Sequence, residues 1–309
     1  MKFVIFGTGG VGGYFGGRLA QAGEDVTFIA RGVNLSAITE TGLRVDSIEG
    51  DFLVKPAVAT DSPESIDPVG VVILAVKAWQ LQESLGQLHS LIKNETVILP
   101  LLNGVDHIDL LRNEFGDEHL LVGLCRISSF LVGPGHVKHV GVQPYIAFGE
   151  LDNRKSARID ALHRIFKKLT GVASEVPANI GLALWEKFLM ICAFSGVGAV
   201  TRQPIGGFRA VPETRKMFRR ALEEVVAVAN ARGIELTQGS VQSVVERLDS
   251  TQPDMLASMQ KDIMEDRPSE LEAQTGALVR MGHALDVSTP THEFIYASLL
   301  PMELRARGK

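Results

Sequence analysis

The spacing of the hydrophobic positions changes about halfway along this chain. In the first half, apolar residues form short, nearly continuous runs separated by stretches with helical spacing. Such runs, rich in Val, Ile and Leu, are typical of strands buried on both faces of a parallel sheet. The pattern predicts strands at Lys2–Phe6, Val26–Ile29, Val71–Val76, Thr96–Leu99 and Leu120–Leu124. We therefore expect an N-terminal domain built from βαβ units.

From about Ile180 onward, apolar residues recur at helical spacing over long stretches, with Gly and Pro between them. This predicts helices near residues 181–200, 213–231, 239–249 and 268–284. The fold class expected is α/β, with a Rossmann-type doubly wound sheet in residues 1–177 and an all-helical domain in residues 178–309.

Residues 127–149 are harder to assign. They hold three short strand-like pieces, RISSFLV, HVKHVG and PYIAFGE, separated by Gly and Pro. This pattern favours an antiparallel addition at the edge of the sheet.

Composition narrows the function classes. The 309 residues are 45% hydrophobic and 22% charged, enough for one large or two ordinary folded domains. The net charge of −5 lacks the basic excess that binding to a phosphate backbone requires, so we expect no nucleic-acid partner.

The cysteines and the apolar runs indicate a cellular location. Cys125 and Cys192 are far apart without a CxxC motif, so we expect free thiols in a reducing compartment, and hence a soluble, cytoplasmic protein. The run Phe188–Val200 is shorter than the roughly 18 to 20 residues of a membrane span, and we expect no membrane partner. His136 and His139, three apart in a strand-like piece, point to opposite faces, and no metal site is predicted.

A glycine-rich turn follows the first predicted strand. Gly7, Gly9 and Gly12 have the G-x-G-x-x-G spacing and precede an apolar helix. In a dinucleotide-binding turn the first glycine allows the tight bend, the second lets backbone approach a pyrophosphate, and the third lets helix and strand pack closely. The alternative is a glycine-rich turn without a ligand. We favour cofactor binding by the whole turn, which consists of Gly7, Thr8, Gly9, Gly10, Val11 and Gly12.

Arg31 occupies the end of the second predicted strand, about 20 residues beyond the turn. An acidic residue there would bind the ribose hydroxyls of NAD, whereas arginine suits a 2′-phosphate. The alternative is a solvated loop arginine. The position favours NADP as the cofactor.

Two further polar residues follow predicted strands at the edge where ligands bind in this fold. Lys77 follows VVILAV, and Asn103 follows TVILPLL. Either could contact cofactor or substrate. Equally, Lys77 could open an exposed helix, and Asn-Gly is common in turns.

Taken together, several blocks of the sequence resemble the ketopantoate reductase (2-dehydropantoate 2-reductase) family. They are GTGGVG with Arg31, VKAWQ around Lys77, the LNG of Asn103, LWEKF around Lys187, and SMQKDI followed by PSELEAQTG. The resemblance implies an enzyme in which NADPH reduces a 2-keto acid, ketopantoate, to pantoate for pantothenate and coenzyme A synthesis. The resemblance also implies that the helical domain binds substrate. It is compatible with a homodimer held together by that domain.

The resemblance also implies roles for individual residues. Lys187 would donate the proton, Asn103 would contact cofactor and substrate, Ser258 would hold the substrate, and Glu270 would lie beside the cofactor and the lysine. Without the resemblance, Lys187 would be an ordinary surface lysine of an amphipathic helix. Likewise, Glu270 would be explained by the favourable interaction of a glutamate with the dipole at a helix N-terminus. Ser258 would be an ordinary serine on a helix face.

The sequence departs from the family at two places after Lys187. Family members carry asparagines four and eight residues on, where this chain has Ile191 and Ser195. Ser195 can still hydrogen-bond to a substrate, whereas Ile191 cannot. Ser129 matches, by a looser alignment, a family position near the cofactor.

Alternatives therefore remain open for substrate and assembly. One is a related dehydrogenase acting on a different 2-keto or 3-hydroxy acid, and another is a non-enzymatic NADP-responsive regulator. A basic cluster fits either a solvated helix face or a subunit contact; it comprises Arg209, Arg215, Lys216, Arg219 and Arg220.

Overall fold

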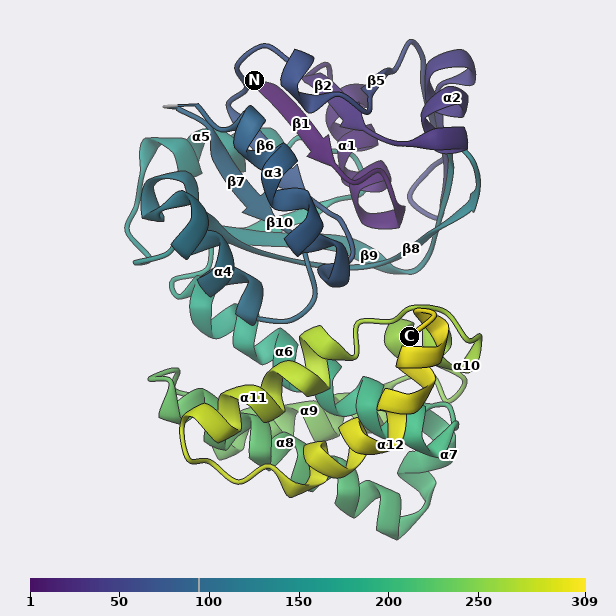
Figure 1. Cartoon of the computed structure of the whole chain (residues 1–309), viewed down its shortest axis with the longest axis vertical. Coiled ribbons are helices and arrows are strands. Elements are labelled where there is room, and N and C mark those ends of the chain that lie inside the picture. The colour runs from purple at the N-terminus through teal and green to yellow at the C-terminus, as the bar shows by residue number, and fades with distance from the viewer. Residues whose placement is uncertain (94) are drawn as a thin grey trace. The chain divides into compact units, whose positions relative to one another are not determined.

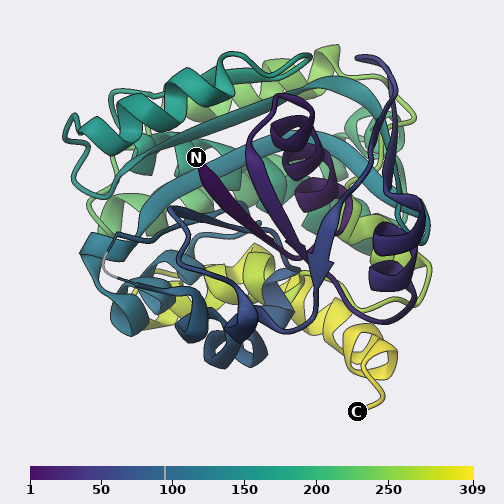
Figure 2. The same cartoon turned by 90° about the horizontal axis from the view of Figure 1, so that it is seen from above.

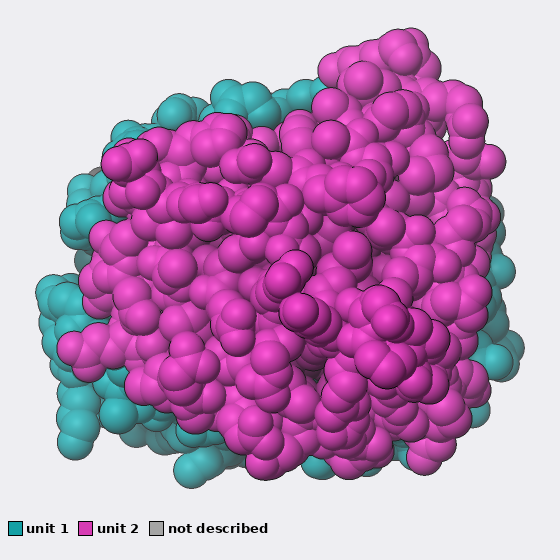
Figure 3. All heavy atoms as spheres, turned by 90° about the horizontal axis from the view of Figure 1, so that it is seen from below, with its two compact units in different colours: residues 1–102, 108–180 teal, residues 103–107, 181–309 magenta. Residues whose placement is uncertain are grey.

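The computed structural model describes residues 1–93 and 95–309, which divide into two compact units. Unit 1 comprises Met1–Leu102 and Ile108–Ile180, and unit 2 comprises Asn103–His107 and Gly181–Lys309 (Figure 3). The division follows contacts rather than chain order, because a five-residue segment from the first half belongs to unit 2.

Unit 1 contains a five-stranded parallel sheet in the order β5-β2-β1-β6-β7. The strands are β1 (Lys2–Phe6), β2 (Asp25–Ile29), β5 (Val58–Thr60), β6 (Val71–Leu74) and β7 (Val97–Pro100). The helices α1 (Gly10–Gln21), α2 (Gly32–Thr41), α3 (Leu81–Leu91) and α4 (Asp106–Phe115) follow strands of this sheet in the chain (Figure 1). The strand order reverses between β1 and β6, as in a Rossmann-type sheet, and confirms the predicted fold class.

A second sheet of unit 1 contains the two longest strands, β8 (Leu121–Gly133) and β9 (His136–Glu150), shown as long curved teal ribbons in Figure 2. They pair with each other antiparallel. The strands β3 (Leu43–Ser47) and β10 (Ala173–Glu175) pair parallel with β9, and β4 (Phe52–Val54) pairs with β3.

The antiparallel pairing predicted for residues 127–149 is confirmed, but their division into three separate strands was wrong. The second and third pieces form one strand, β9, and the first continues β8. Gly141 and Pro144 do not end β9. They lie where the register of the pairing between β8 and β9 shifts, opposite the step from Arg126 to Ser128, and strand pairing continues on both sides of this irregularity. The hairpin belongs to a second sheet rather than to the edge of the parallel one, although Leu120, just before β8, forms an isolated bridge with Ile98 of β7.

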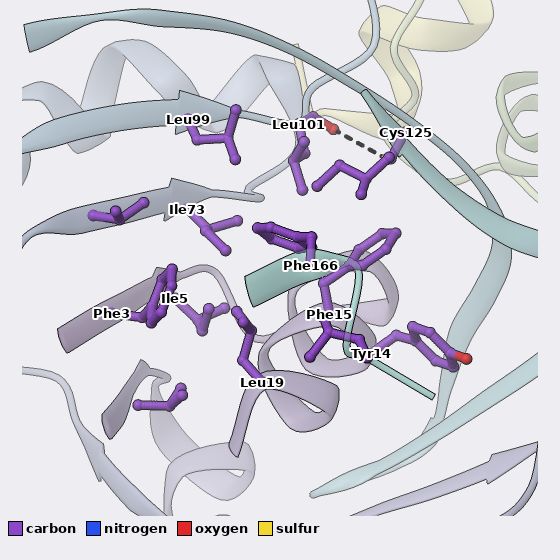
Figure 4. Packing of buried hydrophobic residues seen from close by; sticks show 14 of the residues in the cluster. Phe3, Ile5, Tyr14, Phe15, Leu19, Ile73, Leu99, Leu101, Cys125 and Phe166 are labelled. Atoms are coloured by element: carbon purple, nitrogen blue, oxygen red, sulfur yellow. Dashed lines mark hydrogen bonds between the residues drawn. The ribbon is translucent and has the colours of Figure 1, made fainter. Parts of the chain in front are cut away.

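The main core of unit 1 lies between the parallel sheet, α1 and the helix α5 (Ala157–Phe166). Figure 4 shows Ile5 of β1, Phe15 and Leu19 of α1, and Phe166 of α5 gathered there, all fully buried. A fully buried side chain of this size contributes about 1.5 to 3 kcal/mol to folding. Nearby, Cys125 donates through its thiol to the carbonyl oxygen of Leu101 at 3.8 Å. Cys125 and Cys192 are both buried, and no disulfide joins them within the described residues.

Unit 2 is helical. Its helices are α6 (Ile180–Thr201, starting at the unit boundary), α7 (Ile205–Ala210), α8 (Pro212–Ala231), α9 (Gln238–Ser250), α10 (Ser258–Met264), α11 (Ala277–Ala284) and α12 (Pro290–Ala306). The helix predicted near 268–284 starts later and begins with a π-helical turn, η4 (Glu272–Gly276). The N–H of Gly276 donates to the carbonyl of Leu271 five residues back, at 2.9 Å. Such turns are rare and frequently occur at functional sites.

Helix α6 is long and strongly apolar. It is 22 residues long and is the one helix of the described residues that could cross a membrane by length and composition. Most of that stretch, 61%, is buried within the protein. The helix therefore has the burial of a core helix, which accounts for its apolar sequence.

Candidate functional site

In unit 1 the glycine-rich turn is held by close packing at two of its glycines. Gly7 has φ +102°, a conformation that favours glycine, and a Cβ there would lie 2.8 Å from the backbone nitrogen of Val76. A Cβ on Gly12 would lie 2.1 Å from the carbonyl oxygen of Gly7. Both positions require the absence of a side chain, so the turn brings the start of α1 against the end of β1.

Gly9 is different, because a Cβ there would meet nothing within 4 Å. It is the N-cap of α1, and the first helical hydrogen bond runs from the N–H of Gly13 to its carbonyl. The N–H groups before Gly13 therefore have no acceptor within the helix. Val11, within this first turn, is half-buried. An open backbone at a helix N-terminus suits a phosphate group.

Ser129 of β8 lies directly against this turn. A Cβ on Gly10 would be 2.2 Å from the carbonyl oxygen of Ser129, so only glycine fits there. The Ser129 hydroxyl is buried and has no hydrogen-bond partner among the described residues. A polar atom so placed is available to a bound molecule. The looser alignment thus points to a residue that does lie beside the turn.

Thr8 connects the turn to the next strand. Its hydroxyl donates to the carbonyl of Ile29 at 2.8 Å, and its own carbonyl accepts from the Asn34 side chain at 3.1 Å. Arg31 follows β2 two residues after Ile29 and is exposed, and its guanidinium donates to the side-chain carbonyl of Gln87 on α3. Because that partner is neutral, the contact leaves the positive charge of Arg31 uncompensated.

Lys77 lies just beyond β6 and is exposed. Its backbone N–H donates to the side chain of Gln80 at 3.1 Å. It follows Val76, which packs against Gly7. The chain therefore brings Lys77 to the same edge of the sheet as the glycine turn.

In unit 2 three candidate residues lie on one face of α6. Lys187, Ile191 and Ser195 are four residues apart, so they succeed one another along the same side of the helix. Lys187 and Ile191 are half-buried, and Ser195 is 3% exposed. The first two are therefore the more accessible part of this face.

Asn103 and Glu270 are brought together, although 167 residues separate them. The side-chain N–H of Asn103 donates to a carboxylate oxygen of Glu270 at 2.8 Å. Glu270 is 4% exposed, so this charge-assisted bond forms largely away from water.

Two further contacts hold the segment Asn103–His107 in unit 2. Gly104, at φ +98°, packs so closely on the π-helical turn that a Cβ would lie 2.5 Å from the carbonyl oxygen of Ala273. Asp106 accepts from Arg280 of α11 at 3.5 Å, while burial raises the pKa of the Asp106 carboxyl. The segment is thus fixed to η4 and α11 by side chains and by backbone.

Ser258 is exposed at the first turn of α10. The buried side chain of Gln260 ties this helix to the end of α6, donating to the carbonyls of Gly198 at 3.0 Å and Gln203 at 2.9 Å. No hydrogen bond joins Ser258 to Lys187, Asn103 or Glu270 in the part of the chain that the structure describes.

His107 belongs to none of the sequence motifs described above. It lies in the first turn of α4, four residues after Asn103, and is 3% exposed. Burial, followed by the positive charge of Lys187, lowers the pKa of its imidazole to about 3. The sequence offers one signal, a histidine close behind the LNG turn, which by itself does not distinguish a buried residue from a solvated one.

Other polar features are held by internal contacts. Within residues 1–93 and 95–309, no group of three His, Cys, Asp or Glu side chains is arranged to hold a metal ion. In the basic cluster, Arg209 donates to the carbonyls of Leu248 and Thr251, and Arg215 pairs with Asp249 at 2.6 Å. These two arginines therefore fasten neighbouring helices.

Comparison with known proteins identifies the family. The family model "Ketopantoate reductase PanE/ApbA" matches residues 3–153, and its C-terminal counterpart matches residues 179–303. The chain belongs to the ketopantoate reductase family. It is therefore an oxidoreductase of a family that uses a nicotinamide dinucleotide.

Three relatives indicate how this family varies. An uncharacterized oxidoreductase of Bacillus subtilis (strain 168) is 32% identical, over 97% of this chain and 98% of its own length. The structure of 2-dehydropantoate 2-reductase from Geobacter metallireducens GS-15 has a TM-score of 0.90 and 31% identity, covering 97% of this chain and 99% of that one. The structure of D-mandelate dehydrogenase with NADH and anilino(oxo)acetate has a TM-score of 0.87 and 26% identity, covering 99% of both chains.

Proposed function

We propose that this protein catalyses the NADPH-dependent reduction of a 2-keto acid to a 2-hydroxy acid, with 2-dehydropantoate as the first substrate to test. The observation that carries the proposal is the bond between Asn103 and Glu270, which joins two positions of the family's motifs across 167 residues. The half-buried Lys187 on α6 supplies the acid that such a reaction needs.

Unit 1 has the features required to bind the cofactor. The open backbone at Gly9 and the N-terminus of α1 would take the pyrophosphate, and the unpartnered hydroxyl of Ser129 borders the same turn. Arg31 and Lys77 would bind phosphate or ribose groups, Arg31 the 2′-phosphate that distinguishes NADP from NAD. When bound, NADPH supplies the hydride that adds to the keto carbon.

Lys187 would act on the oxygen of that carbonyl. Negative charge develops there as the carbonyl is reduced, and a neighbouring ammonium group stabilises it. The Nζ–H bond then breaks, its proton passes to the oxygen to give the hydroxyl, and the neutral amine regains a proton from solvent. Asn103, aligned by Glu270, would contact both substrate and cofactor, and Ser258 and Ser195 would bind the substrate.

The identity of the keto acid depends on Ile191. An isoleucine that faces a substrate hydroxyl or carboxylate leaves it without a hydrogen bond, at a cost of about 1 to 3 kcal/mol. The same side chain would favour an alkyl or aryl group. The similarity to D-mandelate dehydrogenase, solved with anilino(oxo)acetate, supports a preference for a 2-keto acid with a more apolar side chain.

A substrate panel tests this proposal. NADPH oxidation would be followed with 2-dehydropantoate and with 2-keto acids bearing alkyl or aryl side chains, in the wild type and in Ile191→Asn. We expect the apolar substrates to have the higher kcat/KM in the wild type, and the asparagine to raise kcat/KM for 2-dehydropantoate about ten-fold or more. If 2-dehydropantoate is already the best substrate and asparagine brings no gain, the inference from Ile191 is wrong. If tight NADPH binding is accompanied by no turnover of any keto acid, the protein is a cofactor-responsive regulator instead.

A further inference from the structure

His107 is a buried polar residue that the proposed reaction has not yet used. Its side chain is 3% exposed, and neither ring nitrogen has a hydrogen-bond partner among the described residues. Buried polar atoms are nearly always paired, because losing water without a replacement partner is unfavourable. The two ring nitrogens are therefore available to a group that comes within hydrogen-bond distance of them.

The position of His107 in unit 2 is fixed. The segment Asn103–His107 is attached at Asn103 by the bond to Glu270, at Gly104 by the contact with Ala273, and at Asp106 by Arg280. The positive charge of Lys187 on α6 acts on the imidazole, since after burial it is the second cause that lowers the pKa of the ring. Contacts of the residues that precede His107 in the chain therefore hold the ring in place, within reach of the charge of the proposed proton donor.

The charge state of His107 determines which hydrogen bonds its ring can donate and accept. With a pKa of about 3, the ring is neutral at physiological pH and carries one N–H donor and one unprotonated nitrogen that accepts. A lysine ammonium has three donors and no acceptor. No hydrogen bond or ion pair engages the Lys187 ammonium within residues 1–93 and 95–309. The two groups are complementary.

Glu270 and Asp106, the acidic side chains attached to this segment, already have partners. Glu270 accepts from Asn103, and Asp106 from Arg280. A carboxylate would moreover hold the ammonium in its charged form more strongly than a neutral acceptor does, which opposes release of the proton. A neutral ring can orient Nζ without that opposition.

We propose that His107 is a positioning residue, whose unprotonated ring nitrogen accepts a hydrogen bond from Nζ of Lys187 during turnover and directs another Nζ–H at the substrate carbonyl oxygen. This inference rests on the proposed role of Lys187 as proton donor. It assigns His107 no proton transfer of its own.

The charge state of His107 can be measured in the wild-type protein, with one variant used only to assign the signal. In protein labelled with ¹⁵N-histidine, the ring resonances of His107, assigned by their loss in His107→Phe, should not titrate between pH 5 and 9. A midpoint near 6.5 would show a solvated ring and overturn the proposal.

Kinetics test the positioning role. We expect His107→Leu to lower kcat about ten-fold to a hundred-fold, the effect of losing one hydrogen bond to a charged group, with the Kd for NADPH unchanged. His107→Gln keeps an acceptor and should recover part of the loss. In a Lys187→Ala background, His107→Leu should have little further effect, because residues that act as a unit are not additive.

The outcomes separate this inference from the proposed function. Equal losses from His107→Leu with and without Lys187 would mean that His107 acts only on folding. A normal kcat in His107→Leu, together with a severe loss in Lys187→Ala, would reject the positioning role and leave the proton donor in place. A normal kcat in Lys187→Ala would reject the donor, and the inference with it.

Discussion

Two regions are built by opposite means: the glycine turn of unit 1, and the lysine face of unit 2, which is the side of α6 that carries Lys187, Ile191 and Ser195. The turn lies within Gly7–Gly12 and presents backbone, and its shape depends on the absence of side chains at Gly7, Gly10 and Gly12. The candidate groups of unit 2 are side chains of α6, of the segment Asn103–His107 and of Glu270, which lie far apart in the sequence. A backbone site is encoded locally, whereas a side-chain site depends on the tertiary contacts that assemble it.

The largest effect is expected from removing the side chain of Lys187, which tests the side-chain site of unit 2. We expect Lys187→Ala to lower kcat by about 10² to 10⁴, as the loss of a general acid should, with the Kd for NADPH nearly unchanged. Glu186→Ala is a matched control, because Glu186 is the exposed neighbour on the same helix. Steady-state kinetics and fluorescence titration of NADPH measure the two quantities. A variant with near-normal kcat would remove Lys187 from the chemistry.

Arg31 tests whether a single side chain adds selectivity to the backbone site. We expect Arg31→Ala to weaken NADPH binding about ten-fold to a hundred-fold, since one charge-assisted contact contributes about 1.5 to 3 kcal/mol. Binding of NADH should hardly change. An equal loss for both cofactors would contradict this role.

Gln87 offers a complementary variant, because it is the neutral partner of Arg31. Gln87→Glu would place a carboxylate against the guanidinium and compete with a 2′-phosphate for it. We expect the ratio of NADPH to NADH affinity to fall, though less than in Arg31→Ala. The ratio of the two dissociation constants, measured by titration, should stay as in the wild type if Arg31 plays no part in selectivity.

The glycines of the turn should separate folding from binding. Gly12→Ala places a Cβ 2.1 Å from the Gly7 carbonyl, and we expect a loss of about 1 to 3 kcal/mol in the free energy of unfolding. Gly9→Ala meets nothing within 4 Å and should leave stability nearly unchanged while weakening NADPH. The exposed Gly86 of α3, equally open, is a control in which alanine should slightly stabilise the helix. Urea denaturation with NADPH titration tests all three, and comparable destabilisation by Gly9→Ala would contradict the distinction.

The smallest effect concerns the pH dependence of stability. The pKa of His107 is about 3 in the folded chain, against about 6.5 for an ordinary histidine. Between these values the unfolded chain binds a proton that the folded chain does not, so this residue makes stability fall as the pH drops below 6.5. Between pH 7 and 5.5 the wild type should lose about 1 kcal/mol more than His107→Phe. Denaturation curves at the two pH values give the difference, and parallel behaviour of the two proteins would refute it.

Buried strands were the most predictable part of the fold. The runs at β1, β2, β6 and β7 are apolar on both faces, and the predicted limits agree with the structure within two residues. Short edge strands such as β5 were missed, because Val58–Thr60 is partly exposed and carries no continuous apolar run. The π-helical turn could not be read from periodicity, since the bond from Gly276 to Leu271 adds one residue to a single turn.

The candidate site was predictable to the extent that it is local or shared by the family. The glycine motif specifies its own geometry, and the end of a predicted strand indicated Asn103. The family resemblance supplied Lys187, Glu270 and Ser258 as candidates. What no periodicity could give is the pairing of Asn103 with Glu270, or the burial of His107 four residues later. Both depend on the assignment of Asn103–His107 to unit 2, which only the folded contacts reveal.

That assignment changes how this protein can be recombined with its relatives. An exchange of parts at residue 180 alone would join the LNG turn of one parent to the π-helical turn of another. The close approach of Gly104 to Ala273 leaves no room for a mismatch there. A chimera that preserves the lysine face must therefore take residues 103–107 from the same parent as the C-terminal half, although the residues on both sides of this segment come from the other parent.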